Sequence, residues 1–143
     1  MFEAFAEYEP LYTPAGFAAT AITATQVVSR TAEGPVWVAV LDESIVGTAS
    51  VIAKGDSLYI RGMAVLPAAR GLRIGELLLK HVEQFAVAGN FRRLLLSTTP
   101  FLHRAIRLYE RFGFRRTNDG PQDLFGTPLF SMEKVLSDID FSL

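Results

Sequence analysis

Three short stretches at the centre of the chain, residues 36–41, 45–53 and 58–65, are rich in β-branched and other apolar residues. Such stretches are typical of β-strands, because β-branched and aromatic side chains pack well on a pleated surface. Short polar turns at residues 42–44 and 54–57 separate them. Strands joined by turns this short pair antiparallel, so the pattern predicts a three-stranded meander.

Farther along the chain, apolar residues recur every three to four positions, which is the period of a helix. This spacing predicts one helix over residues 73–88 and a second from the capping pair Thr99 and Pro100 to about Phe112. The remaining apolar stretches have the composition of strands, at residues 93–98, 114–117 and 129–136. The predicted order β-β-β-α-β-α-β-β is a mixed α/β fold, with helices packed on a central sheet.

The beginning of the chain has a weaker pattern. Residues 2–8 and 24–31 each predict a short helical piece, and the breakers between them predict an irregular stretch over residues 10–22. We find no repeats, low-complexity tracts or linkers. A length of 143 residues fits one domain, residues 1–143.

Composition excludes several classes of protein. Half of the residues are apolar and only 20% are charged, which excludes disorder for most of the chain. The absence of cysteine excludes disulfides and thiolate sites, and with only two histidines we expect no metal centre. The chain starts without a basic signal region and has no apolar run of about 18 residues, so we expect no membrane partner and a cytoplasmic protein.

The net charge of −1 conceals an uneven distribution. Residues 61–116 hold eleven basic and three acidic residues, a balance of +8, and the rest of the chain has a balance of −9. A basic half in a near-neutral protein predicts an anionic ligand. The total is not basic enough to favour nucleic acid, so a small phosphate-bearing ligand fits better. A solvated charged face is the alternative.

Residues 65–78 run from a strand through a turn into the first predicted helix. No Ser, Thr or Asp precedes the helix, so its first amides lack the usual side-chain cap. Gly71 and Gly75 have no side chain that would cover the backbone, and Arg70 and Arg73 each directly or closely precede one of these glycines. Free amides, a positive helix end and two guanidinium groups predict an anion site. A helix end that simply frays in water is the alternative.

Two motifs together resemble those of the GNAT superfamily of N-acetyltransferases. The family's phosphate loop, Arg/Gln-x-x-Gly-x-Gly/Ala, is matched by residues 70–75, with Arg73 where the family has its first glycine. We expect a helical φ to accommodate that arginine. Residues 105–114 resemble the family's Ala-x-x-Leu-Tyr-x-x-x-Gly-Phe. The resemblance covers roughly residues 34–136 and implies the family's fold.

The resemblance implies direct transfer of an acetyl group from acetyl-CoA to an amine. It places the pantetheine arm along the third strand, with the Val65 amide at the developing oxyanion and a bulge marked by Gly62. It makes Tyr109 the general acid for the leaving thiolate, against the alternative of an ordinary core tyrosine. The residues that the resemblance assigns to the cofactor are Met63, Ala64, Val65, Arg70, Gly71, Leu72, Arg73, Ile74 and Gly75.

Some positions depart from the family pattern. The third strand carries Arg61 and no carboxylate, so no general base is evident, and Leu102 stands where many members have Asn. His103 lies on a different helical face from Tyr109, and we expect it at the surface. These departures leave a second hypothesis, a GNAT-fold module that binds acyl-CoA or a partner protein without catalysis. The acceptor, a small molecule or a protein N-terminus, is expected between the loops at residues 8–16 and 118–127.

Family members usually begin with a strand followed by a long helix. Residues 2–8 resemble the end of that helix, so we expect the first strand and the first helical turns to be missing. The strand at residues 36–41 is then expected to be an unpaired edge, or to be covered by the N-terminus or by a partner chain. A homodimer is one way to cover it.

Overall fold

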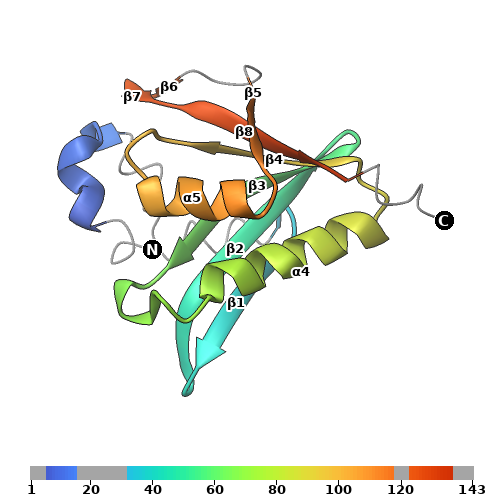
Figure 1. Cartoon of the computed structure of the whole chain (residues 1–143), viewed down its shortest axis with the longest axis horizontal. Coiled ribbons are helices and arrows are strands. Elements are labelled where there is room, and N and C mark those ends of the chain that lie inside the picture. The colour runs from blue at the N-terminus through green and yellow to red at the C-terminus, as the bar shows by residue number, and fades with distance from the viewer. Residues whose placement is uncertain (1–5, 16–31, 118–122, 137–143) are drawn as a thin grey trace.

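The computed structural model describes residues 6–15, 32–117 and 123–136. The helix expected at residues 24–31 lies outside these residues. In chain order the elements are η1 (Ala6–Leu11), β1 (Val36–Leu41), β2 (Ser44–Lys54), β3 (Ser57–Val65), η2 (Pro67–Ala69), α4 (Ile74–Ala88), β4 (Arg93–Thr98), α5 (His103–Arg111), β5 (Arg115–Thr117), β6 (Asp123–Leu124), β7 (Thr127–Pro128) and β8 (Phe130–Val135). The predicted mixed α/β order is confirmed (Figure 1).

The predicted meander is present as the antiparallel ladders β1–β2 and β2–β3. The turn between β1 and β2 consists of Asp42 and Glu43, with φ values of 49° and 66°. Two residues with positive φ give a turn whose twist matches that of the flanking strands. The chain therefore makes the hairpin tightly enough for the two strands to pair.

The six main strands form one sheet in the order β1-β2-β3-β4-β8-β5. β3 and β4 are parallel neighbours, but they pair only from Ser57 with Arg93 to Tyr59 with Leu95. Beyond Tyr59 the two strands lose their ladder, and β3 continues to Val65 paired with β2 alone. The sheet therefore opens at its centre, and this opening positions the site.

A β-bulge lies in β3 where the opening begins. Ser50 pairs with Gly62 and Val51 pairs with Ile60, which leaves Arg61 as the extra residue. The bulge was expected at Gly62 and lies one residue earlier. Bulges bend a strand and increase its twist, which helps β3 to diverge from β4.

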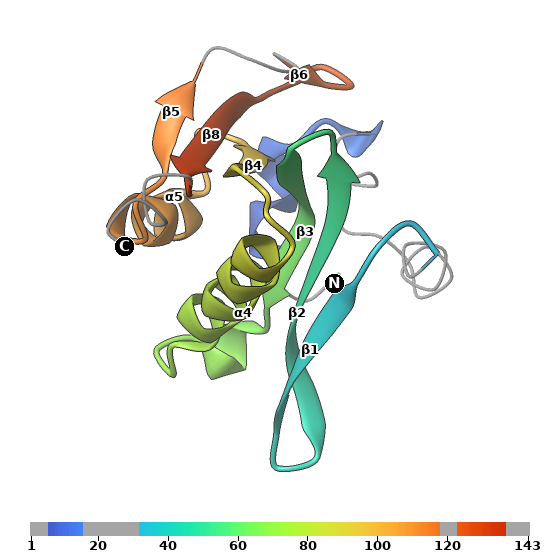
Figure 2. The ribbon, with the colours of Figure 1, turned by 90° about the vertical axis from the view of Figure 1, so that its right-hand side faces the viewer.

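The two α-helices lie on the same side of the sheet (Figure 2). α4 packs along β2 and β3 and buries Leu79, Val82 and Ala86 completely. The second half of α5 lies beside the N-terminal end of α4, since a Cβ on Gly75 would lie 2.8 Å from Leu108 Cδ2. Burial of these apolar faces is the main stabilising contribution. Neither helix has the length and apolar run that a bilayer crossing requires.

Three expectations about element bounds were wrong. α5 starts at His103, because the N–H of Leu102 donates to the Thr99 carbonyl at 3.2 Å and makes a separate turn first. Residues 6–11 form a 3-10 helix that contains Pro10, and residues 1–5 lie outside the described part. The loop expected at residues 118–127 contains the short hairpin β6–β7.

β1 is the end strand of the sheet in the described part of the chain, as expected for an edge strand. Its Val38 and Val40 side chains are exposed. Residues 6–10 lie in η1 rather than in a strand that could cover this edge.

Candidate active site

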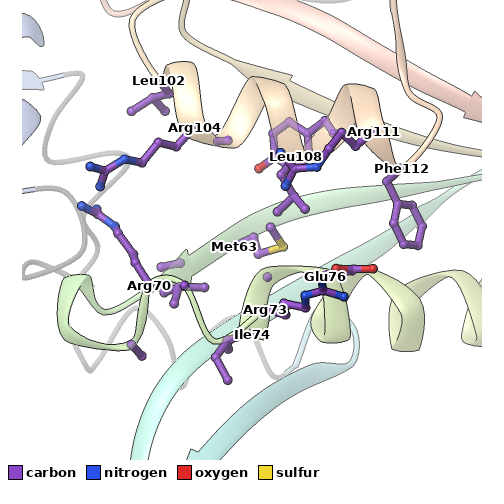
Figure 3. A pocket seen from close by; sticks show the side chains of 17 residues that line it. Met63, Arg70, Arg73, Ile74, Glu76, Leu102, Arg104, Leu108, Arg111 and Phe112 are labelled. Carbon is purple, nitrogen blue, oxygen red and sulfur yellow. The ribbon is translucent and has the colours of Figure 1, made fainter.

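A pocket of about 610 Å³ lies between the end of β3, the η2–α4 connection and α5 (Figure 3). It is lined by nine of the ten residues that the sequence assigned to cofactor or catalysis: Met63, Ala64, Val65, Arg70, Gly71, Arg73, Ile74, Gly75 and Tyr109. The exception is Leu72, whose side chain is 52% exposed and does not line the pocket. Residues as far apart in the sequence as Met63 and Tyr109, 46 positions from each other, therefore meet at one cavity.

The edge of β3 that faces the opening carries backbone groups with no strand partner in the described part of the chain. The N–H of Leu66 donates to the Val46 carbonyl of β2 at 2.8 Å. Because successive N–H groups along a strand point to opposite edges, the N–H groups of Met63 and Val65 point away from β2. They face the side where β4 no longer pairs, so this edge is available to an extended ligand.

The connection from η2 to α4 presents the uncapped end of a helix. No side chain of the described residues caps the N-terminus of α4, and its first intrahelical bond runs from the Leu77 N–H to the Arg73 carbonyl at 3.1 Å. The N–H groups of residues 74–76 therefore have no acceptor within the helix. Together with the positive helix end, they form a site for an anion.

Arg73 adopts a left-handed backbone conformation, with φ of 60° and ψ of 28°. The expectation of a helical φ at this position was wrong. Left-handed φ values favour glycine, because a Cβ there approaches the following carbonyl oxygen. The departure from glycine at Arg73 thus places an ordinary side chain in a strained conformation and adds a guanidinium to the pocket.

Gly75 lies close to side chains of α5 and β3. A Cβ at this position would lie 2.8 Å from Leu108 Cδ2 and 3.9 Å from Met63 Cε. A side chain at this position would displace the end of the Leu108 side chain, whereas the contact with Met63 has an ordinary length. The sequence had suggested a bare backbone here for the ligand, and the structure adds contact between elements as a second reason.

Tyr109 lies on α5 and is only 8% exposed. Its ring packs at a tilt against Phe114, with centroids 5.8 Å apart. Burial raises the pKa of Tyr109 to about 12, and the charge of nearby Tyr12 adds to the rise. Tyr109 is therefore protonated at neutral pH, and it lines the pocket.

The segment around Tyr12 is held against the turn that precedes α5 and against the β6–β7 hairpin. Tyr12 is 7% exposed, and its ring packs edge-on against the ring of Phe101, with centroids 4.7 Å apart. The Thr13 N–H donates to Thr127 Oγ1 at 2.9 Å, and the Thr13 hydroxyl donates to the Phe125 carbonyl at 2.9 Å. The two loops expected to border the acceptor therefore touch each other.

The acidic residues in or beside these two loops include Glu7, Glu9 and Asp123. Glu9 is exposed, and the side chain of Glu7 lies outside the described part. Asp123 Oδ2 accepts from the Gly126 N–H at 2.8 Å and so stabilises the hairpin turn. Arg61 on β3 is paired with Glu33 at 2.8 Å. His103 is exposed, as expected.

Seven of the ten arginines in the basic half of the chain fall into two groups. Arg61, Arg92 and Arg93 are paired with carboxylates elsewhere on the molecule. Four other arginines line the pocket, namely Arg70, Arg73, Arg104 and Arg111. Glu76, which also lies 3.9 Å from Lys80, is the one carboxylate among the described residues that line it. The described part of the lining is therefore positively charged.

Sequence reasoning missed Arg104 and Arg111. Both lie on the face of α5 that carries Leu108, at the helical spacing of four and three residues. That spacing was the available signal. Leu102, at the beginning of α5, also lines the pocket and contributes an apolar surface.

Comparisons with known proteins agree with this architecture. The family model "Acetyltransferase (GNAT) family" matches residues 2–114. The N-acetylaspartate synthetase of Danio rerio is 35% identical over 85 residues, which are 58% of this chain and 30% of that protein. The human N-acetylaspartate synthetase is 37% identical over 81 residues, or 55% of this chain and 27% of that protein. The match thus spans about a third or less of these relatives' own length.

Solved structures show the same fold. The IAA acetyltransferase of Bacillus cereus has a TM-score of 0.72 at 20% identity, covering 80% of this chain and 85% of that one. The PaiA N-acetyltransferase of Thermoplasma acidophilum, in complex with coenzyme A, has a TM-score of 0.77 at 14% identity, covering 94% and 87%. Taken with the family match over most of its length, these findings show that the chain belongs to the GNAT family of acetyltransferases.

Proposed function

We propose that this protein transfers the acetyl group of acetyl-CoA directly to a primary amine. The observation that carries the proposal is the opening between β3 and β4, where an unpaired strand edge, an uncapped helix end and a buried tyrosine line one pocket. Each of these features has a counterpart in the ligand. The pantetheine arm pairs with the strand edge, the diphosphate binds at the helix end, and the thioester sulfur lies near the tyrosine.

The strand edge positions the thioester. In the proposed complex the backbone of Met63, Ala64 and Val65 pairs with the amides of the pantetheine arm. The Val65 N–H, which points away from β2, donates to the acetyl carbonyl oxygen. Negative charge develops on this oxygen as the amine attacks, so a fixed donor lowers the barrier.

The loop at residues 70–75 and the first turn of α4 hold the diphosphate. The free N–H groups of residues 74–76 fit an anion with several acceptor oxygens. Arg70 and Arg73 add positive charge from the same loop. Leu72 contributes backbone only, since its side chain lies outside the pocket.

Tyr109 assists the departure of the thiolate. Its pKa of about 12 lies above the value of about 8.5 for a thiol, so complete proton transfer to the thiolate costs about 5 kcal/mol. A hydrogen bond from the protonated phenol stabilises the developing thiolate without that cost. We therefore assign Tyr109 as a hydrogen-bond donor to the sulfur, while the proton released by the amine reaches water.

The second hypothesis, a non-catalytic acyl-CoA-binding module, has two observations in its favour. Arg73 occupies a left-handed position that favours glycine, and no carboxylate of the described residues on β3 can serve as a base. Such a module binds acetyl-CoA and releases no coenzyme A when amines are added.

The test combines calorimetric titration of acetyl-CoA with an assay of thiol release from acetyl-CoA in the presence of amines. Relatives named N-acetylaspartate synthetase, and a structural neighbour named ribosomal-protein-S18-alanine N-acetyltransferase, suggest L-aspartate and an alanyl peptide as the first amines. We expect binding in the micromolar range and thiol release that depends on one amine. Binding without release above the rate in water supports the module, and no binding by a folded sample contradicts both.

A further inference from the structure

Phe125 lies in the tight turn of the β6–β7 hairpin, in a backbone conformation that aromatic residues rarely adopt. Phe125 and Gly126 are the two residues between the short strands, and their φ values are 49° and 90°. A two-residue turn with positive φ at both positions favours Asn-Gly or Asp-Gly, because a larger side chain in the left-handed region crowds the backbone. Phe125 is therefore strained in a way that asparagine would relieve.

Burial of the Phe125 side chain does not offset this strain, since the side chain is 67% exposed. Phe125 is also the one aromatic residue among the described residues other than glycine that have a positive φ. The others are polar or charged, namely Asp42, Glu43, Arg73 and Asn90. Strain of this kind persists where neighbouring contacts hold the backbone, and it is concentrated at sites that bind ligands.

Hydrogen bonds within the hairpin and from the N-terminal segment hold the backbone of this turn. The Gly126 N–H donates to Asp123 Oδ2 at 2.8 Å, and the Phe125 carbonyl accepts from the Thr13 hydroxyl at 2.9 Å. The Thr13 N–H in turn donates to Thr127 Oγ1 at 2.9 Å. These contacts fix the turn, so the exposed Phe125 ring projects from a rigid base.

The N-terminal segment also connects this turn to the pocket. Tyr12, which precedes Thr13, packs against Phe101 in the turn before α5, and its charge adds to the effect of burial that raises the pKa of Tyr109. Figure 1 shows η1 and the β6–β7 hairpin at the end of the molecule where α5 begins. In the proposed function the donor enters from the η2–α4 connection. The acceptor then reaches the thioester from the other side of Tyr109, where Tyr12 and the hairpin lie.

We propose that Phe125 is a specificity-determining residue for the acceptor, and that its ring packs against an apolar group next to the reacting amine. This proposal rests on the proposed function. An exposed aromatic ring gains most from contact with another ring or an aliphatic group, because both surfaces leave water. The acceptor class is therefore a primary amine with an apolar substituent. The strain at Phe125 is retained because the turn holds the ring in place for this contact.

The test measures kcat/KM for two amines that differ only in the apolar group, glycinamide and L-phenylalaninamide, with thiol release as the readout. We expect the wild type to prefer L-phenylalaninamide by about tenfold or more, as burial of one aromatic group implies. In Phe125→Asn the preference is expected to fall to about twofold or less, with kcat/KM for glycinamide unchanged. Val40→Asn is the matched control, because Val40 is 61% exposed on β1 and does not line the pocket. We expect Val40→Asn to keep the preference of the wild type.

The stability of Phe125→Asn gives a second readout, which a merely structural role would not produce. Asparagine adopts a positive φ more readily than phenylalanine does. The midpoint of thermal unfolding is therefore expected to rise by a few degrees in the same variant that loses the preference. Higher stability together with lower selectivity is the expected result for strain that serves binding.

Four results overturn the proposal. Equal kcat/KM for the two amines in the wild type shows that no apolar group is recognised. An unchanged preference in Phe125→Asn shows that the ring does not contact the acceptor. An equal loss of preference in Val40→Asn shows a general effect of exposed apolar residues. A lower unfolding midpoint in Phe125→Asn shows that packing rather than strain determines this position. Failure of the proposed function is distinguishable, because the wild type then releases thiol with none of the amines, L-aspartate included, and that result contradicts both proposals.

Discussion

Arg73 occupies a position where the backbone conformation and the side chain disagree. Its φ of 60° lies in the left-handed region, which costs a residue other than glycine about 1–2 kcal/mol. The sequence showed the missing glycine of the motif but not the φ at this position. A residue type alone does not report a positive φ, so this strain was visible only in the structure.

Arg73→Gly is expected to raise the free energy of unfolding by about 1 kcal/mol, because relief of strain exceeds the added entropy of the unfolded chain. Denaturant unfolding measures this change. Arg73→Ala is the matched control, since it removes the charge and keeps the Cβ. Equal free energies of unfolding in the two variants show that no strain is relieved at this position.

Among the single residues of the site, those that belong to motifs were predictable and their neighbours were not. Tyr109 and Gly75 came from their motifs, and the structure places both at the pocket. Arg104 lies at helical spacing on the same face as Leu108, but nothing in the sequence said which cavity that face borders. Tyr12 is 97 positions from Tyr109, and only the folded chain brings the two together.

At the scale of elements, two buried threonines behave differently. Thr127, 1% exposed, is the hydrogen-bond partner that ties the N-terminal segment to the β6–β7 hairpin through Thr13. Thr99, 2% exposed, lies between β4 and α5, and its hydroxyl has no hydrogen-bond partner in the described part of the chain. The two threonines are similarly buried and differ in hydrogen bonding, so comparing them isolates the effect of the hydrogen bond on stability.

Thr127→Val is expected to lower the free energy of unfolding by about 1–3 kcal/mol, because the Thr13 N–H loses its acceptor in a partly buried place. Thr99→Val is expected to be neutral or to stabilise slightly, since valine has nearly the same shape and no hydroxyl to desolvate. Urea unfolding of both variants measures the difference. Equal losses of stability in the two variants contradict the anchoring role given to Thr127.

Where apolar residues follow a clear strand or helix pattern, the bounds of the element were predicted within one or two residues. β1, β4 and α4 follow directly from β-branched runs or helical spacing. α5 was expected too early, because Thr99 and Pro100 form a typical capping pair but belong to a separate turn. The β6–β7 hairpin has only two residues in each strand, which is too short to show a period.

At the scale of the whole molecule, the opening of the sheet decides what the protein can do. If β3 and β4 paired along their whole length, β4 would cover the edge of β3. Here only three residue pairs connect the two strands. The sequence showed an anion site in the basic half of the chain but not how its arginines divide. Three of these arginines are paired with carboxylates away from the pocket, and four others line the pocket. That division depends on tertiary contacts between distant segments.

The most direct test of acetyl transfer compares Tyr109→Phe with the wild type, using the amine that supports the fastest thiol release. We expect the rate to fall by about a hundredfold or more, because the variant loses the donor to the leaving sulfur. The dissociation constant for acetyl-CoA is expected to stay the same, since the phenyl ring still fills the pocket wall. An unchanged rate in the variant contradicts the role of Tyr109 and with it the catalytic account of this pocket.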